Sequence, residues 1–190
     1  MNLGLFGGSF DPVHAGHLLV ARAAREEAAL DRIFFIPAAQ SPFKPAAAPA
    51  PAAERVRLLR LALAGDCAAE VDEQEIQRGG VSYSIETVRR YAANYPKANL
   101  FYLIGADQLP QLHLWRDAAD LARYVEFLII PRPGDSPAAV PAGIRARLLG
   151  GWPLAISSSQ IRARVKAGVS ISHLVPAAVA EAIRNNRLYL

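Results

Sequence analysis

The chain has 190 residues, 52% hydrophobic and 20% charged, which is the balance of a globular protein with one substantial core. Its net charge of +4 suits phosphate-rich ligands, but without a basic block it excludes a nucleic-acid binder. One cysteine excludes an internal disulfide, and no apolar run approaches the roughly 20 residues of a membrane span, so we expect a cytoplasmic protein.

The first half of the chain alternates between short apolar runs and helix-forming stretches. Apolar runs that end at a turn residue, such as Pro37, are typical of buried parallel strands. The Pro- and Ala-rich tract 45–53 has low complexity and predicts a mobile segment. In chain order we expect a strand at 3–6, a helix at 18–30, a strand at 32–36, a loop at 38–53 and a helix at 54–64.

The second half continues the alternation, and Ser82 or Ser84 is a good capping residue for the helix that follows them. Here the expected elements are strands at 69–72, 99–104, 125–130 and, weakly, 152–156, with helices at 84–95, 158–167 and 176–185. Strands separated by helices predict an α/β fold, a Rossmann-like doubly wound and mainly parallel sheet with helices on both faces. We expect one domain over 1–190, with a helical C-terminal part at about 157–190.

The segment Gly7 to His17 follows the first strand and carries the strongest chemical signal. Its glycines let backbone N–H groups approach an anion, and the helix start behind them adds further unpaired N–H groups. His14 and His17 stand three apart, where a helical turn aims both at one point. Their pairing predicts a site for a phosphate whose charge changes during a reaction.

Other interpretations of this segment are weaker. It lacks the glycine spacing of a dinucleotide fingerprint and the Gly-Lys-Ser/Thr of a Walker loop. Two imidazoles could hold zinc, but Cys67 stands alone and His113 and His173 have no partners nearby in sequence, so we expect no protein-held metal. Polar histidines at a glycine turn with a helix cap are the plain structural alternative.

The segment Gly7 to His17 resembles the first signature of the nucleotidylyltransferase superfamily, Gly-x-(Thr/Ser)-x-Asp-x-x-His-x-Gly-His. The second signature, Ile-Ser-Ser-(Thr/Ser)-x-x-Arg, is matched by Ile156 to Arg162. Over nearly the whole chain the resemblance narrows to the bacterial nicotinate-nucleotide adenylyltransferases. The residues that carry this closer resemblance are Ser82-Tyr83-Ser84 with Thr87, Ile104 to Asp107, Trp115, Arg132-Pro133-Gly134 and the segment Asn186 to Tyr189.

The resemblance implies an enzyme of NAD biosynthesis that joins nicotinate mononucleotide to the AMP part of ATP and releases pyrophosphate. Such a reaction needs aligned anions and stabilised charge rather than a covalent intermediate. It implies Mg²⁺ entering with ATP. It also implies His14, His17 and Arg162 as catalytic residues, and an ATP site made of Gly7, Gly8, Ser9, Phe10, His14, His17, Gly105, Asp107, Ile156, Ser157, Ser158 and Arg162.

For the mononucleotide, the resemblance implies contacts from Ser9, Phe10, Lys44, Ser84, Trp115, Arg116 and Arg132. Trp115 is expected to stack on the pyridine ring, with a core tryptophan as the alternative. Asp11 is expected to orient the loop or to be a plain turn aspartate. The chain departs from the family at Ala38, Phe43 and Arg116, which leaves open how the second loop meets the substrates and whether Arg116 faces water.

Two rival functions stay open. One keeps the superfamily but changes the acceptor, above all to nicotinamide mononucleotide. The other is a nucleotide-binding sensor without catalysis. We expect no nucleic-acid or membrane partner, and a monomer or a homodimer.

Overall fold

The computed structural model describes residues 1–42, 49–131, 140–151 and 154–190. Within them a six-stranded sheet has the order β3-β2-β1-β4-β5-β6, and all of its neighbouring strands are parallel. This is the strand order of a doubly wound α/β fold, so the predicted fold class is confirmed. The strands are β1 (Asn2–Gly8), β2 (Arg32–Pro37), β3 (Ala69–Val71), β4 (Asn99–Gly105), β5 (Val125–Ile130) and β6 (Ala146–Leu148).

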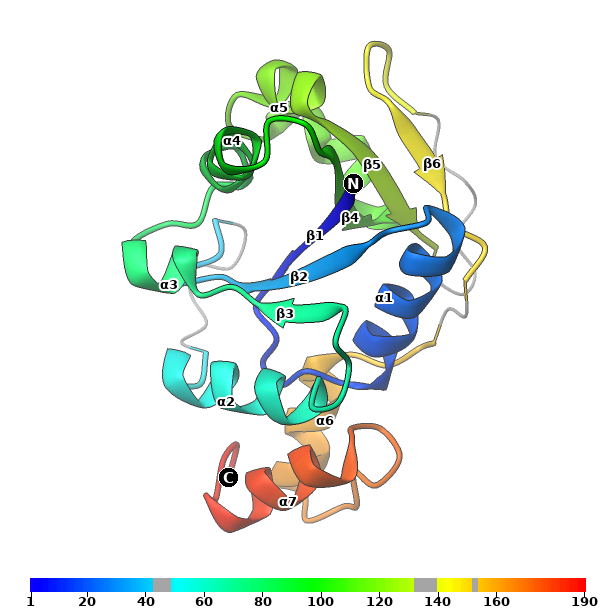
Figure 1. Ribbon diagram of the computed structural model, residues 1–190. Helices are drawn as coiled ribbons and strands as arrows, with labels where there is room; N and C mark the ends of the chain where they lie inside the picture. The colour runs from blue at the N-terminus through cyan, green and yellow to red at the C-terminus, as the bar shows by residue number, and fades with distance from the viewer. Residues whose placement is uncertain (43–48, 132–139, 152–153) are drawn as a thin grey trace.

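Helices cover both faces of the sheet (Figure 1). They are α1 (Ala15–Glu27), α2 (Ala52–Ala62), α3 (Gln74–Arg78), α4 (Ser84–Asn94), α5 (Ala118–Tyr124), α6 (Ser158–Lys166) and α7 (Ala177–Asn185), with a 3₁₀ helix η1 (Ala106–Leu114). Side chains alternate along each strand, so one face receives Phe35 and Phe101 and the other receives Phe34 and Tyr102. The first face packs on α1, α2, α6 and α7, and the second packs on α4, η1 and α5.

The expected strand at 152–156 is wrong for its described part, because residues 154–156 lie outside any strand. The sixth strand is Ala146–Leu148 instead, and it pairs with Phe127, Leu128 and Ile129 of β5. This edge strand has only three residues, and one of them, Arg147, is charged, so the sequence contains no apolar run that would predict it.

The structure corrects several element boundaries. Helix α1 begins at Ala15, three residues before the expected start, and α2 takes the last two residues of the expected loop. Neither serine caps α4: Tyr83 holds the N-cap position, Ser84 is the first helical residue, and the Ser82 hydroxyl accepts a hydrogen bond from the Ala39 N–H instead. Three helices were not predicted: α3 and α5 have only five and seven residues, and the 3₁₀ helix η1 contains Pro110, which argues against a helix.

The chain order reverses between β1 and β4, which lie side by side. In open parallel sheets a ligand crevice forms outside the carboxyl ends of the strands at this point. The segments after β1, β2 and β4 therefore share one edge of the sheet, where a ligand site is expected.

Candidate active site

The loop after β1 brings the two histidines into direct contact. The His14 and His17 rings are stacked with centroids 3.6 Å apart. His14 is the N-cap of α1, and each backbone N–H donates to the Nδ1 of the other histidine, at 3.2 Å from His14 N and 3.4 Å from His17 N. The sequence expectation that both side chains lie together is confirmed.

This reciprocal cap decides which ring nitrogen carries the proton. A ring Nδ1 that accepts a hydrogen bond has no proton, so the neutral His14 and His17 rings carry theirs on Nε2. Burial lowers the pKa of His14 from 6.5 to about 4, so this ring is neutral at physiological pH. Each neutral ring is therefore a hydrogen-bond donor at its outer edge.

Gly16 makes the stacked pair possible. A Cβ at this position would lie 3.1 Å from both Nδ1 and Cε1 of the His14 ring, closer than the ring tolerates without moving. The same Cβ would lie 4.0 Å from Ile156, at the start of the second signature. The glycine between the histidines thus lets the His14 ring lie close to α1, while the Ile156 distance is an ordinary packing contact.

The second signature lies against the first. Ser157 caps α6 through a capping box with Gln160, and the Ser158 hydroxyl donates to the Pro12 carbonyl at 2.8 Å. The Arg162 guanidinium donates from Nη1 to the Asp11 carbonyl at 2.7 Å. The expected convergence of the two signatures, 146 residues apart at the Ser158–Pro12 contact, is confirmed.

Asp11 fixes the loop rather than being a plain turn residue. Its Oδ1 accepts hydrogen bonds from the Ala50 N–H at 3.1 Å and from the Tyr189 hydroxyl at 2.9 Å. Its Oδ2 lies 3.6 Å from Nη1 of Arg162. Because the Asp11 side chain is buried, these contacts tie the loop firmly to the segment before α2, to α6 and to the segment after α7.

Arg55 on α2 also holds this loop in place, a role that the sequence did not predict. Only 1% of the residue is exposed, although it lies on a helix with several charged neighbours. It donates from Nη1 to the Ser9 carbonyl at 2.8 Å and from Nε to the Ala50 carbonyl at 3.1 Å. Burial lowers its pKa, and the nearby Asp11 charge opposes that shift.

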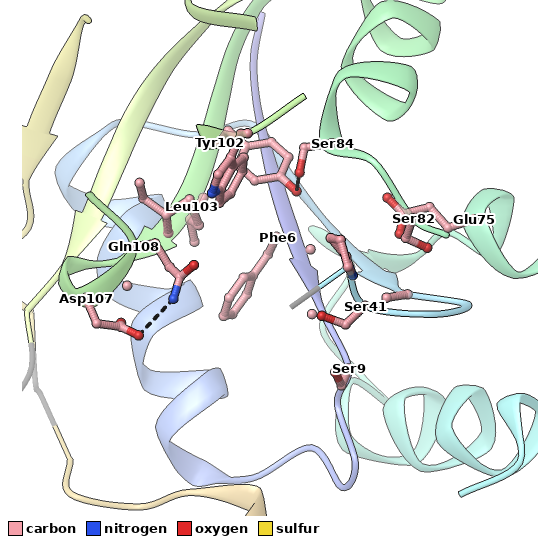
Figure 2. Close-up of a pocket in the computed structure, with 17 residues that line it drawn as sticks. Phe6, Ser9, Ser41, Glu75, Ser82, Ser84, Tyr102, Leu103, Asp107 and Gln108 are labelled. Carbon is pink, nitrogen blue, oxygen red and sulfur yellow. Dashed lines mark hydrogen bonds between the residues drawn. The ribbon is translucent and has the colours of Figure 1, made fainter. Parts of the chain in front are cut away.

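A cavity of about 300 Å³ opens beside this loop, at the carboxyl ends of β1 and β4 (Figure 2). Seven of the predicted site residues contribute to its lining: Gly7, Gly8, Ser9, Ser84, Gly105, Asp107 and Trp115. Asp107 accepts a hydrogen bond from the Gln108 amide at 2.9 Å, and the two side chains lie on one wall of the cavity. Ala38, one of the departures from the family pattern, lies in the lining as well.

Tyr102 forms part of the cavity and explains why the chain has Gly7 opposite it. A Cβ at Gly7 would lie 2.6 Å from the Tyr102 hydroxyl, so no larger residue fits without displacing the phenol. The hydroxyl forms a 2.8 Å hydrogen bond with Ser84 Oγ, and the ring makes an edge contact with Trp115 at 6.1 Å. Burial raises the pKa of Tyr102, so the phenol stays protonated.

Glu75 also lines the cavity, and sequence reasoning missed it. It accepts a hydrogen bond from the Thr87 hydroxyl at 2.5 Å and another from Ser82. Burial is the main cause that raises its pKa, and these hydroxyls oppose the shift. Locally the residue is one of two charged side chains on a five-residue helix, so no sequence signal marks it as buried.

Other predicted residues lie beside the cavity or outside the described residues. Phe10 is 2% exposed, and its ring packs against His17 at 5.0 Å, so only its backbone is available to a ligand. Arg116 lines a smaller adjacent cavity of about 80 Å³, where its guanidinium lies 4.6 Å from the Tyr83 ring and pairs with Glu86 at 3.3 Å. Phe43, Lys44, the segment 132–134 and the tract 45–48 lie outside the described residues.

The described ranges contain neither a metal-binding cluster nor a membrane-spanning helix. Among these residues, no group of three or more His, Cys, Asp or Glu side chains lies close enough to hold a metal ion. No helix in the same ranges combines the length and the apolar character that a bilayer crossing requires.

A family model described as cytidylyltransferase-like matches residues 5–164. The match begins in β1 and ends within α6, so it includes both signature segments and the cavity between them. The chain therefore belongs to the cytidylyltransferase-like family, and it is an enzyme of the nucleotidyltransferase class.

Similar curated proteins place the chain in one branch of this class. It is 43% identical to a protein of Opitutus terrae, with all of this chain and 98% of the relative aligned, and 42% identical over the full length of both chains to one of Solibacter usitatus. Both carry the name "Probable nicotinate-nucleotide adenylyltransferase". The chain groups with the bacterial nicotinate-nucleotide adenylyltransferases, as the motifs predicted.

A solved structure shares the fold at low sequence identity. Plasmodium falciparum nicotinic acid mononucleotide adenylyltransferase, complexed with NaAD, superposes with a TM-score of 0.82. It is 16% identical, and the alignment covers 99% of this chain and 97% of that one. The match supports the doubly wound architecture described above.

Proposed function

We propose that this enzyme transfers the AMP part of ATP to nicotinate mononucleotide, in the manner that the names of its relatives describe, and releases pyrophosphate. The observation that carries the proposal is the meeting of the two signatures. The stacked histidines and Arg162 surround the loop after β1, beside a cavity with room for a nucleotide.

The chemistry is a direct displacement at phosphorus. An oxygen of the mononucleotide phosphate attacks the α-phosphorus of ATP, a new P–O bond forms, and the bond to the β-phosphate oxygen breaks. The attacking phosphate is already ionised at neutral pH, so the step needs no strong base. The protein contributes alignment and stabilisation of the charge that develops on the α-phosphate and on pyrophosphate.

The histidine pair supplies donors for that charge. With Nδ1 engaged by the opposite backbone N–H, each neutral ring donates from Nε2, and we assign His17 to the α-phosphate and His14 to the adjoining phosphate chain. Because the cap fixes the rings before substrate binds, little reorganisation is needed during the reaction. The backbone N–H groups of Gly8, Ser9 and Phe10 add donors at the same loop.

The second signature holds the leaving group. The N-terminus of α6 at Ser157 and Ser158 presents backbone N–H groups that favour an anion, while the two hydroxyls hold the segment in place through Gln160 and Pro12. Arg162 lies one turn further and offers a forked set of donors to the β- and γ-phosphates. Ile156 contributes backbone contacts at the same place.

Different residues of the cavity are assigned to the two substrates. We assign Gly105 and Asp107 to the ribose of ATP, since a carboxylate accepts from both ribose hydroxyls. We assign Trp115 to the pyridine ring and Ser84, at the start of α4, to the nicotinate carboxylate. Lys44, Arg116 and Arg132 are proposed as further contacts to the anionic mononucleotide.

A divalent cation accompanies ATP in this proposal, and Mg²⁺ is the specific ion that we propose. It arrives on the phosphate oxygens of the substrate and keeps several waters. The exposed Cys67 thiol suits a reducing compartment, in keeping with a cytoplasmic enzyme.

Pyrophosphate release tests the proposal. The purified protein is incubated with ATP and Mg²⁺ and, in separate reactions, with nicotinate or nicotinamide mononucleotide. We expect fast pyrophosphate release with the acid and slow release with the amide, because the amide lacks the carboxylate to which Ser84 is proposed to donate. Equal or faster release with the amide overturns the acceptor assignment, and no release with either overturns the activity.

A variant links the activity to the site. His17→Ala is expected to lower kcat by roughly 10²–10³-fold, the usual effect of losing one donor to a developing oxyanion. Since Nδ1 of His17 also accepts from His14, its fold is checked by circular dichroism. Wild-type turnover in a folded His17→Ala protein would contradict the assigned role.

A further inference from the structure

The segment after α7 turns back sharply on the helix. The Leu188 N–H donates to the Ile183 carbonyl at 3.0 Å, and the Arg187 N–H donates to the Arg184 carbonyl at 3.3 Å. This pair of bonds is a Schellman motif, whose left-handed position is usually glycine. Here Arg187 occupies it with φ 51°, so the turn is made by a residue that disfavours it.

The turn delivers Tyr189 to the loop after β1. Its hydroxyl donates to Oδ1 of Asp11 at 2.9 Å, a contact between residues 178 positions apart. Tyr189 itself has φ 68°, a second left-handed conformation within three residues. Two unfavourable backbone conformations in so short a segment indicate that the docked position is held by strong contacts.

The ring and the hydroxyl of Tyr189 have separable purposes. The ring packs against the core cluster on the α7 side of the sheet, together with Leu188. Phenylalanine would provide the same packing. The hydroxyl, in contrast, donates a hydrogen bond to the buried Asp11 carboxylate. Burial and the Asp11 charge raise the pKa of Tyr189, so the phenol keeps the proton that it donates.

The Asp11 carboxylate lies between the Tyr189 hydroxyl and the Arg162 guanidinium and connects the two. The Tyr189 hydroxyl and the Ala50 N–H both bind Oδ1, which stops the carboxylate from rotating. Oδ2 is thereby left facing Arg162, whose Nη1 lies 3.6 Å away and also donates to the Asp11 carbonyl. Without the hydroxyl, one of the two bonds that orient the carboxylate is lost.

We propose that Tyr189 is a positioning residue for the ATP phosphate site, acting through Asp11 on Arg162. This inference rests on the proposed function, in which Arg162 binds the phosphates of ATP. It assigns a role to the segment Asn186 to Tyr189 that the proposed reaction does not itself explain. In Figure 1 the C-terminus lies beside α7 and α2, at the same end of the molecule as α6.

The test is Tyr189→Phe, which removes the hydroxyl and keeps the ring. We expect KM for ATP to rise roughly five- to thirtyfold, and kcat/KM for ATP to fall with it, the effect of losing one hydrogen bond to a charged group. We expect KM for the mononucleotide to stay within twofold. A merely structural role would lower the fraction of active enzyme and leave both KM values unchanged. Tyr124→Phe on α5, at the opposite end of the molecule, is the matched control and should change neither value.

A second variant tests the route through Arg162. In an Arg162→Lys background, adding Tyr189→Phe should change kcat/KM for ATP by less than twofold, because the group that Tyr189 positions is already altered. Full additivity of the two losses, or an unchanged KM for ATP in Tyr189→Phe alone, overturns the inference and leaves the proposed function intact. If the wild type makes no pyrophosphate, the proposed function fails, and calorimetric affinity for Mg²⁺–ATP in the same variants still decides the positioning role.

Discussion

His14 combines two duties in one ring, and a pair of substitutions separates them. Its Nδ1 caps α1 by accepting from the His17 N–H, while its Nε2 is the proposed donor to ATP. An asparagine side chain places an oxygen near the position of Nδ1 and nothing at Nε2. A glutamine side chain places an amide near Nε2 and loses the short-range cap. His14→Asn therefore keeps the cap, and His14→Gln keeps the donor.

The two substitutions are expected to affect different quantities: one lowers kcat and the other lowers the free energy of unfolding. Loss of the donor in His14→Asn should lower kcat by roughly 10²–10³-fold. Loss of the cap in His14→Gln should lower the free energy of unfolding by about 1 kcal/mol relative to His14→Asn. We place this value in the lower half of the range for caps because the bond to the His17 N–H is long, at 3.4 Å. Glutamine should keep kcat within about tenfold of wild type.

The assays are steady-state pyrophosphate release with both substrates and urea unfolding followed by circular dichroism. Both variants remove the buried ring, so the loss of its packing is common to the two and cancels in the comparison. If His14→Asn is the more active of the pair, the Nε2 donor is wrong. If His14→Gln is the more stable, the capping role is wrong.

Three further predictions follow from the geometry. Burial lowers the pKa of His14 to about 4, so between pH 6.5 and 4 the imidazole is protonated in the unfolded chain but not in the folded one. Urea titrations should therefore show the free energy of unfolding falling by up to ~3 kcal/mol over this pH range, and His14→Asn should lack this component. Gly7→Ala should push the Tyr102 hydroxyl off Ser84 and raise KM for the mononucleotide several-fold, and adding Tyr102→Phe should recover part of the loss, whereas additive losses in steady-state kinetics would contradict the steric reason. Arg55→Met should lower the free energy of unfolding by about 3–5 kcal/mol in urea, since it removes the buried guanidinium that donates to the Ser9 and Ala50 carbonyls, while the exposed Arg57→Met on the same helix should cost under about 0.5 kcal/mol.

The parts that the sequence predicted well depend on local patterns. The apolar runs of β1, β2, β4 and β5 are buried on both faces, so their character is visible without knowing their neighbours. The histidine pair was predictable because residues three apart at a helix start necessarily share a face. Composition and spacing carry both signals directly.

The parts that escaped prediction depend on tertiary contacts. Arg55 lies between Glu54 and Arg57 on a helix, which is the pattern of a solvated face, and only docking of the β1 loop makes it buried. Glu75 likewise gains its role from Thr87 and Ser82, which approach from another element. Ser82 was expected to cap α4, but the β2 loop competes for its hydroxyl and wins.

The contact between Ser158 and Pro12 has a consequence for biosynthesis of the chain. A ribosome releases the β1 loop early, yet the groups that clamp it are translated 146 residues later. A nascent chain halted before residue 157 could build much of the sheet while its nucleotide end stayed unformed. Under the proposed function, ATP binding needs both signatures, so a chain would acquire it only near the end of its synthesis.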